Sequence, residues 1–233
     1  MKKLLVSDYD QTFYLNDEDI EKNKIAVKEF RNKGNIFVIA TGRSYGDFMK
    51  KKEQYNIEYD YVIINHGATI LDKEDNIIFE AIMPNEILDS LKSDLHIENT
   101  ERHFCCSLLE SRVEFEHKNL TKVHVKYNDL EYSNEIQKNL EEKYGDVLNI
   151  YYVSGNSIEI ISKNTNKSKS IKLLSEKIEI KQEDIYTIGD GYSDIEMIKD
   201  YNGYAMNESV QELKNVAIEE INNVSELIEK IEG

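Results

Sequence analysis

Four short apolar runs constrain the fold more than any other feature of this sequence. Each is rich in valine, isoleucine or leucine, and none shows the polar alternation of a strand with one solvent-facing side. Helical segments separate the first three, which is typical of a parallel sheet with crossover helices. The runs are KKLLVS at 2–7, NIFVIA at 35–40, YDYVIIN at 59–65 and DIYTIG at 184–189. We therefore expect an α/β fold with a doubly wound parallel sheet.

This alternation is interrupted near Pro84, the single proline of the chain. The stretch that follows reads instead as an α+β module. Its predicted elements are helices over 85–96 and 131–144 and strands over 102–115, 121–127, 147–153 and 156–162. After KNTNKSKS the first pattern resumes, with a helix over 167–179, the strand DIYTIG, a helix from Ser193, a strand GYAM and a helix from about Ser225. A sheet that is interrupted and then completed implies an inserted domain, so we expect a core of 1–83 and 163–233 around a second domain of 84–162.

Composition narrows the possible partners and the compartment. Aspartate and glutamate outnumber lysine and arginine by 45 to 29, a net charge of -16, and no basic cluster offsets this. Nucleic acid and anionic membranes would be repelled. No segment is long and apolar enough for a signal peptide or a membrane span, so we expect a soluble cytoplasmic protein. Cys105 and Cys106 are adjacent in a predicted strand and point to opposite faces, which favours two buried thiols over a disulfide or zinc site.

The loops that follow the buried strands share a chemical theme. Their sequences are SDYDQT, IATGR, INHG and IGDGYSD. In a doubly wound sheet the ligand site lies beyond the carboxyl ends of the strands, so these loops should meet at one edge. Carboxylate oxygens there suit Mg²⁺, and hydroxyl and backbone N–H donors suit a phosphate group.

With these motifs in order, the sequence resembles the haloacid dehalogenase-like phosphatases, in the Cof-type branch with an inserted α/β cap. DYDQT resembles the first family motif and IATGR the second. SIEIISKNTNKSKSIKLL resembles the return from the cap to the lysine of the third motif, and GDGYSD resembles the acidic fourth motif. The resemblance covers nearly the whole chain and implies a Rossmann-like core with an α+β cap at 84–162.

The resemblance implies a division of labour between the two aspartates of the first motif. Asp8 would be the nucleophile that forms an aspartyl-phosphate, and Asp10 would be the general acid and then the general base. Mg²⁺ would be held by the Asp8 carboxylate, the backbone carbonyl of Asp10 and Asp190, and would offset the repulsion between Asp8 and the phosphate.

The remaining motifs supply supporting residues. Thr41 should hydrogen-bond the transferring phosphoryl group, with the amides around Gly42 and Gln11 assisting. Lys167 should neutralise its charge and orient Asp8, although Lys163 and Lys169 lie in the same stretch. The other expected supporting residues are Thr12, which shapes the turn, and Ser193 and Asp194 of the fourth motif.

Several positions depart from the family pattern. Gln11 stands where glycine is common, which is tolerable if the backbone there is not left-handed. Ser193 and His66 each stand where asparagine is usual, and AMNES replaces a Gly-Asn pair. These departures bear on substrate choice more than on catalysis.

Candidate contacts to the leaving group come from both domains. KVHVKY alternates, placing Lys122, His124 and Lys126 on one strand face, which is free to face the core if helices cover the valine face. Arg43 and His66 are further candidates on the core side. A cap of this kind would open and close about 82–84 and 162–165 to admit substrate.

The sequence thus predicts a Mg²⁺-dependent phosphatase that acts on a small phosphate monoester, with a sugar phosphate favoured. Two alternatives stay open at this point. One is a receiver-like signalling domain that accepts phosphate on an aspartate, and the other is a catalytically weak member of the family that only binds phosphate ligands. The oligomeric state and the physiological ester are not determined by the sequence.

Overall fold

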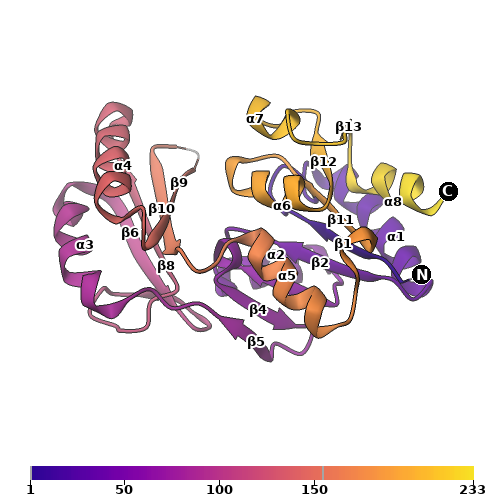
Figure 1. The fold of residues 1–233 in the computed structure, drawn as a ribbon, viewed down its shortest axis with the longest axis horizontal. Helices are drawn as coiled ribbons and strands as arrows, with labels where there is room; N and C mark the ends of the chain where they lie inside the picture. Colours follow the sequence, from indigo (N-terminus) through magenta and orange to yellow (C-terminus); the bar gives the residue numbers. More distant parts are fainter. Residues whose placement is uncertain (1, 154) are drawn as a thin grey trace.

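The computed structural model describes residues 2–153 and 155–233, which form two sheets side by side (Figure 1). The larger sheet has the strand order β13-β12-β11-β1-β2-β3-β4-β5. Six of its strands run parallel, and β4 and β5 are added antiparallel at one edge. The strands are β1 (Leu4–Ser7), β2 (Ile36–Ala40), β3 (Tyr61–Ile64), β4 (Thr69–Asp72), β5 (Ile77–Glu80), β11 (Ile185–Gly189), β12 (Asn202–Met206) and β13 (Glu219–Ile221).

Helices cover both faces of this sheet. On one face lie α1 (Asp17–Asn32), α2 (Tyr45–Tyr55) and α8 (Val224–Glu232), and on the other lie α5 (Lys167–Lys177), α6 (Ile195–Asp200) and α7 (Gln211–Lys214). Strand β1 serves both layers, because Leu5 packs in the first apolar cluster while Leu4 and Val6 pack in the second. Burial on both sides explains why the strand sequences lack polar alternation, and the predicted doubly wound α/β fold is confirmed.

The smaller sheet is built from residues between β5 and α5. Its strands are β6 (Thr100–Ser107), β7 (Glu110–Val113), β8 (Lys122–Tyr127), β9 (Leu148–Val153) and β10 (Ser157–Ser162), in the antiparallel order β7-β6-β8-β10-β9. Helices α3 (Leu88–Asp94) and α4 (Leu130–Tyr144) cover one of its faces. We call residues 84–162 the cap and the rest of the described chain the core, using the predicted boundaries.

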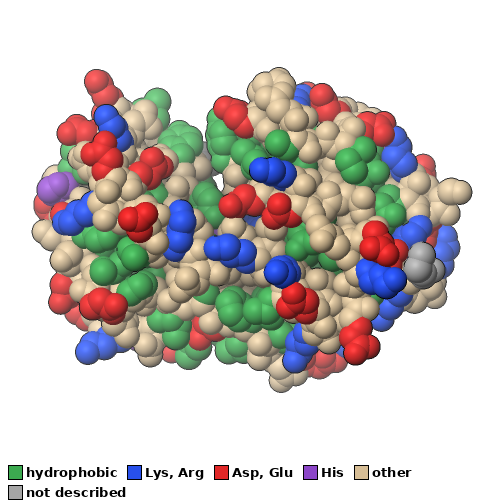
Figure 2. Space-filling model, viewed as in Figure 1, with side chains coloured by type: hydrophobic (Ala, Val, Ile, Leu, Met, Phe, Trp, Pro, Cys, Tyr) green, Lys and Arg blue, Asp and Glu red, His purple; other side chains and the backbone are tan. Residues whose placement is uncertain are grey.

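Alternation within β8 decides which side chains the cap turns toward the core. Val123 and Val125 pack with the cap helices, as expected. Lys122 and His124 therefore lie on the opposite face of the sheet, which is the face that looks onto the core. Figure 2 shows a notch between the two lobes, with acidic and basic side chains gathered along their boundary.

One secondary-structure expectation was wrong, and two further short elements were not expected. The single strand expected over 102–115 is a hairpin of β6 and β7, because the chain turns at Leu108, whose φ of 49° is left-handed. Nothing in the sequence marked that turn, since it contains no glycine, proline or asparagine. The short elements α7 and β13 were missed.

Cys105 and Cys106 are buried free thiols, as expected. Across residues 2–153 and 155–233, no helix has both the length and the apolar character needed to cross a membrane.

Candidate active site

The first site residue, Asp8, directly follows the central strand β1. Its backbone N–H donates to the carbonyl of Ile188 in β11. Its carbonyl accepts from the Ser7 hydroxyl at 2.7 Å and from the backbone N–H of Phe13. Both peptide groups of the residue are therefore fixed, and its carboxylate is held at the carboxyl edge of the sheet.

Lys167 lies opposite Asp8 at the first turn of α5. The helix begins there because the Asn166 side chain accepts the backbone N–H of Lys169 as an N-cap. The Lys167 ammonium group is fully buried and donates to Asp8 Oδ1 at 2.5 Å and to Asp194 Oδ1 at 2.6 Å. Lys163 and Lys169, the two alternatives for this position, are exposed, and Lys169 donates to the Lys163 carbonyl instead.

The loop after β11 adds two more carboxylates. Asp190 Oδ1 accepts from the Thr12 hydroxyl at 2.8 Å, which joins the first and fourth motifs. The other oxygen of Asp194 accepts from the backbone N–H groups of Asp190 and Gly191. Asp194 thus braces both the loop and Lys167.

Three carboxylates form a group that could hold a metal ion. Ligand oxygens of Asp8, Asp190 and Asp194 all lie within 4.8 Å of one another. An oxygen-only set of this charge suits Mg²⁺. The expected ligands included Asp8 and Asp190, and Asp194 was expected either to support the metal shell or to anchor the lysine. Asp10 was expected to contribute only its backbone carbonyl, and its carboxylate lies outside the group.

Electrostatics also favour a cation at this place. Burial, followed by the charges of Asp194 and Asp190, raises the pKa of the Asp8 carboxyl well above its usual value despite the opposing effect of Lys167. Burial and the Asp194 charge raise the pKa of Asp190 to about 6. Burial would lower the pKa of Lys167, but Asp194 and Asp8 outweigh it and the net shift is upward. We call Asp8, Lys167, Asp190 and Asp194 the acidic cluster.

Asp10 is oriented by an arginine of the second motif. Arg43 donates from Nε and from its terminal nitrogen to the two carboxylate oxygens of Asp10, at 2.8 and 2.6 Å. This bidentate geometry fixes the plane of the carboxylate. Arg43 was a candidate substrate contact; the structure places it in the cavity wall and pairs it with Asp10.

The loop of the second motif, expected to bind phosphate, is held by contacts at Thr41, Gly42 and Arg43. Thr41 is buried, and its hydroxyl oxygen accepts the backbone N–H of Arg43 at 3.1 Å. Gly42 lies against the His66 ring, which would overlap a Cβ atom at this position. Gly42 and Arg43 line the cavity described below, whereas Thr41 lies beneath it.

Gln11 was expected to be tolerable only if its backbone were not left-handed, and the structure shows that it is left-handed. Its φ is 59°, so the backbone is left-handed at a position where the family commonly has glycine. A left-handed conformation costs a residue other than glycine about 1–2 kcal/mol. Its backbone N–H donates to the carbonyl of Tyr14, which closes the turn that carries Asp10. No role of the Gln11 side chain explains this strain.

A cavity of about 760 Å³ lies between the acidic cluster and the cap. Most of the predicted site residues of the core line this cavity: Asp8, Asp10, Gln11, Gly42, Arg43, His66, Lys167, Asp190, Ser193 and Asp194. The cap contributes Lys122 and His124, together with Arg102, Phe104, Arg112 and Tyr152, which the sequence interpretation missed. Lys126 does not line the cavity, because its side chain pairs with Glu101 at 2.8 Å on the cap surface. Thr12 does not line the cavity, but its hydroxyl donates to Asp190, which does.

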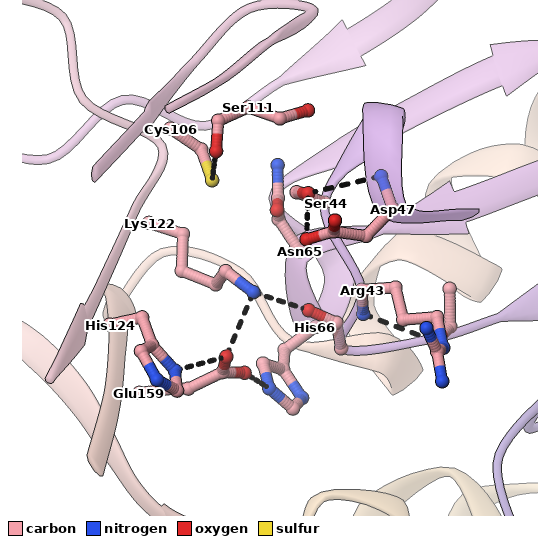
Figure 3. Close-up of polar contacts among 12 residues, drawn as sticks. Arg43, Ser44, Asp47, Asn65, His66, Cys106, Ser111, Lys122, His124 and Glu159 are labelled. Atoms are coloured by element: carbon pink, nitrogen blue, oxygen red, sulfur yellow. Dashed lines mark hydrogen bonds and ion pairs between the residues drawn. The ribbon is translucent and has the colours of Figure 1, made fainter. Parts of the chain in front are cut away.

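Glu159 was also missed, although it organises the boundary between cap and core. This carboxylate on β10 accepts from Lys122 Nζ at 2.9 Å and pairs with His124 Nδ1 at 2.9 Å (Figure 3). Its second oxygen pairs with Nε2 of His66 from the core. A glutamate in an apolar strand, SIEIIS, was the available signal, since a buried carboxylate requires partners. We call Glu159, Lys122, His124 and His66 the joint cluster.

Both carboxylate oxygens of Glu159 have partners in the joint cluster, whereas Nδ1 of His66 is buried without a partner among the described residues. Burial would raise the pKa of the Glu159 carboxyl, but Lys122 and His66 reverse this and hold it well below its usual value. Burial lowers the pKa of His66 despite the opposing effect of Glu159. Lys122 has the largest of the effects that lower the pKa of Glu159, and its ammonium group balances the carboxylate of Glu159.

Comparison with known proteins agrees with this geometry. A family model described as haloacid dehalogenase-like hydrolase matches residues 5–112 and 98–226. The 5-amino-6-(5-phospho-D-ribitylamino)uracil phosphatase of Bacillus subtilis is 27% identical over 225 residues, covering 92% of this chain and 88% of that protein.

Two solved structures share the fold. A haloacid dehalogenase-like hydrolase from Bacteroides thetaiotaomicron superposes with a TM-score of 0.81 at 20% identity, over 99% of this chain and 100% of that one. The subclass IIB sugar phosphatase BT4131 superposes with a TM-score of 0.79 at 19% identity, over 99% of both chains. The family model, the strand order and the acidic cluster lead to one assignment: this chain belongs to the haloacid dehalogenase-like hydrolases, in their Cof-type branch.

Proposed function

We propose that this protein is a Mg²⁺-dependent phosphatase that hydrolyses a small phosphate monoester through an aspartyl-phosphate on Asp8. The observation that carries the proposal is the acidic cluster, in which Asp8 contacts a buried lysine and lies within ligand distance of two further aspartates. The Bacillus subtilis relative is a phosphatase, which supports the reaction class. When bound, Mg²⁺ would reduce the repulsion between the Asp8 carboxylate and the phosphoryl oxygens.

The residues of this chain would divide the first half-reaction as follows. Asp8 attacks phosphorus, so that an O–P bond forms at its carboxylate while the bond from phosphorus to the leaving oxygen breaks. Lys167 stabilises the negative charge on the phosphoryl oxygens. Asp10, in its protonated form, gives its proton to the leaving oxygen, and Arg43 holds that carboxyl in place.

The second half-reaction, hydrolysis of the aspartyl-phosphate, uses the same residues, with Asp10 acting as a base instead of an acid. Asp10, now ionised, takes a proton from a water molecule that attacks phosphorus, and the bond between phosphorus and Asp8 breaks. Inorganic phosphate is released and Asp8 is regenerated. Because the cap covers the cavity, entry of the ester and exit of the products require it to move about 82–84 and 162–165.

The cavity favours a small and polar leaving group. Arg102 and His124 line it from the cap, where a terminal nitrogen of Arg102 lies 3.4 Å from His124 Nε2, and Arg102 makes no ion pair with a carboxylate in the described part of the chain. A hydroxylated, sugar-phosphate-like ester fits these donors and the volume of about 760 Å³. We place this reaction in the cytoplasm, with no nucleic acid or membrane partner, in keeping with the acidic net charge.

A phosphate-release screen over several dozen phosphate esters, with Mg²⁺ and with a chelator, tests the proposal. We expect Mg²⁺-dependent turnover of hydroxylated esters that is lost in Asp8→Asn and kept in Asp89→Asn, a control on the exposed side of α3. Turnover that survives in Asp8→Asn would contradict the mechanism. Phosphate binding without turnover of any ester would favour the weak, ligand-binding alternative. The receiver-like alternative has no support from the family assignment.

A further inference from the structure

Among the described residues of the cap, Lys122 is the side chain that hydrogen-bonds the expected phosphate-binding loop, Thr41 to Arg43. Lys122 Nζ donates to the backbone carbonyl of Gly42 at 2.6 Å, and the lysine itself is 2% exposed (Figure 3). The three carbonyls of this loop have different partners. Thr41 and Arg43 carbonyls accept from the backbone N–H groups of His66 and Asn65 in the core, whereas the Gly42 carbonyl between them accepts from the cap.

The peptide that joins Gly42 to Arg43 links this contact to the site. A trans peptide is planar, so the direction of its carbonyl fixes the opposite direction of its N–H. That N–H, which belongs to Arg43, donates to the hydroxyl oxygen of Thr41. A hydroxyl whose oxygen accepts from the backbone keeps its own proton free to donate. The nitrogen of the same peptide belongs to Arg43, whose side chain binds the Asp10 carboxylate.

Lys122 has little capacity left for substrate. Two of the three N–H bonds of its ammonium group are used by Gly42 and Glu159. The group also lies 5.8 Å from the centre of the Phe104 ring, within the range of a cation–π contact. This geometry therefore does not favour Lys122 as a contact to the leaving group, the role for which the sequence made it a candidate.

We propose that Lys122 is a positioning residue of the cap that completes the phosphate-binding loop by holding the peptide between Gly42 and Arg43. This proposal rests on the proposed phosphatase function and adds a consequence to it. Phosphate recognition by the core depends on a cap residue even when no leaving group is present. Glu159 takes part indirectly, because it accepts a second bond from the Lys122 ammonium and so fixes its direction.

The binding of inorganic phosphate, measured by calorimetry in the presence of Mg²⁺, tests this without a leaving group. We expect Lys122→Met to weaken phosphate binding about 10- to 100-fold, the range for losing a hydrogen bond from a charged donor. Lys126→Met is the matched control, since Lys126 lies on the same strand and pairs with Glu101 outside the cavity. It should bind phosphate as the unaltered protein does.

A double-mutant cycle with Thr41→Val identifies the route of the effect. If Lys122 acts through the peptide that orients Thr41, Lys122→Met should have little further effect once the hydroxyl is absent. Independent, multiplicative losses would overturn the proposal, as would unchanged phosphate binding in Lys122→Met. In either case turnover by the unaltered protein leaves the proposed function intact. No phosphate binding by the unaltered protein would overturn both.

Stability is controlled with a second variant. Lys122→Met leaves the buried carboxylate of Glu159 short of its charged partner and could unfold the cap. Lys122→Met/Glu159→Gln removes both charges together and should show the same loss of phosphate binding as Lys122→Met. Normal binding by the double variant would contradict the proposal.

Discussion

Two buried clusters of charged side chains lie on either side of the same cavity, and they are balanced in opposite ways. The acidic cluster of the core has three carboxylates and a single ammonium group. The joint cluster has one carboxylate, one ammonium group and two imidazoles. The first has an excess of negative charge, and the second is complete without any added ion.

The difference separates a site from a structural contact. Burial and the excess negative charge of the acidic cluster raise the pKa values of Asp8 and Asp190, so that binding of a cation would be favourable there. The pKa of Glu159 is instead lowered by Lys122 and His66 despite its burial. The partners of a buried carboxylate therefore indicate its role. In the acidic cluster, too few cations for the carboxylates indicate a ligand site. In the joint cluster, a carboxylate whose two oxygens are both paired indicates a contact between cap and core.

The largest expected effect comes from removing the single cation of the acidic cluster. Lys167→Met should destabilise the metal-free protein by about 3–5 kcal/mol, because it leaves buried carboxylates without their partner. Added Mg²⁺ should recover part of that loss. Thermal unfolding measures both, and Lys169→Met, at an exposed lysine of the same helix, should change stability by less than about 0.5 kcal/mol. Equal effects of the two variants would contradict the assignment of Lys167.

The joint cluster should respond to loss of charge but not to Mg²⁺. Glu159→Gln is expected to destabilise the protein by about 2–3 kcal/mol, since Lys122 would lose its carboxylate partner in a buried setting. Glu101→Gln, which removes an exposed partner of Lys126, should cost less than about 1 kcal/mol. A Mg²⁺-dependent recovery of Glu159→Gln would show that the two clusters are not distinct.

Mg²⁺ should stabilise the unaltered protein through the acidic cluster. At a concentration about 100 times its dissociation constant, we expect a gain of about 2.7 kcal/mol, seen as a higher unfolding temperature. Asp190→Asn should remove most of this gain, because it takes one oxygen ligand and its charge from the group. Sodium chloride at equal ionic strength is the control, and an equal gain from it would argue against a metal site.

The smallest expected effect is a pH dependence that arises from His66. Its neighbours are Glu159, Lys122 and Lys167, with the Tyr151 ring beside it, and the net result of burial and these charges is a lowered pKa. The folded protein therefore binds fewer protons at this site than the unfolded chain, whose histidine titrates near about pH 6.5, and stability should fall as the pH falls through that value.

His66→Asn should show this loss less strongly than the unaltered protein. Between about pH 7.5 and 5.5 we expect a difference of about 1 kcal/mol in the pH-dependent part of the unfolding free energy. His117→Asn, at an exposed histidine of the cap, should follow the unaltered protein. An identical pH dependence in all three would show that His66 does not titrate differently on folding.

The sequence predicted the acidic cluster more fully than the joint cluster, for a physical reason. Asp8 and Asp190 follow strand ends, and the carboxyl ends of parallel strands meet at one edge of the sheet. Lys167, at the first turn of a helix, was placed by the resemblance to the third family motif. The fold class follows from the strand pattern, and the family from the four motifs in order. The role of Asp194 as a third carboxylate of the group needed coordinates, since the same motif also allows it to brace only the lysine.

Pairings between cap and core could not be read from local sequence. Glu159 and His66 are 93 positions apart and meet only because two separately built sheets face each other. The alternation of KVHVKY placed Lys122 and His124 on the correct face, yet it could not separate them from Lys126, which follows the same period and lies outside the cavity. The turn at Leu108 and the left-handed Gln11 show that residues without a turn preference can adopt turn conformations where the surrounding structure requires them.

The bond from Lys122 to the Gly42 carbonyl has a consequence for protein engineering. A cap of this kind looks exchangeable, because the chain enters and leaves it at two neighbouring points. A cap transplanted from another family member would, however, leave the Gly42 carbonyl and the His66 imidazole without their partners unless it carried equivalents of Lys122 and Glu159. Chimeras should therefore be built with these four positions moved as one set, and libraries that vary leaving-group preference should keep them fixed.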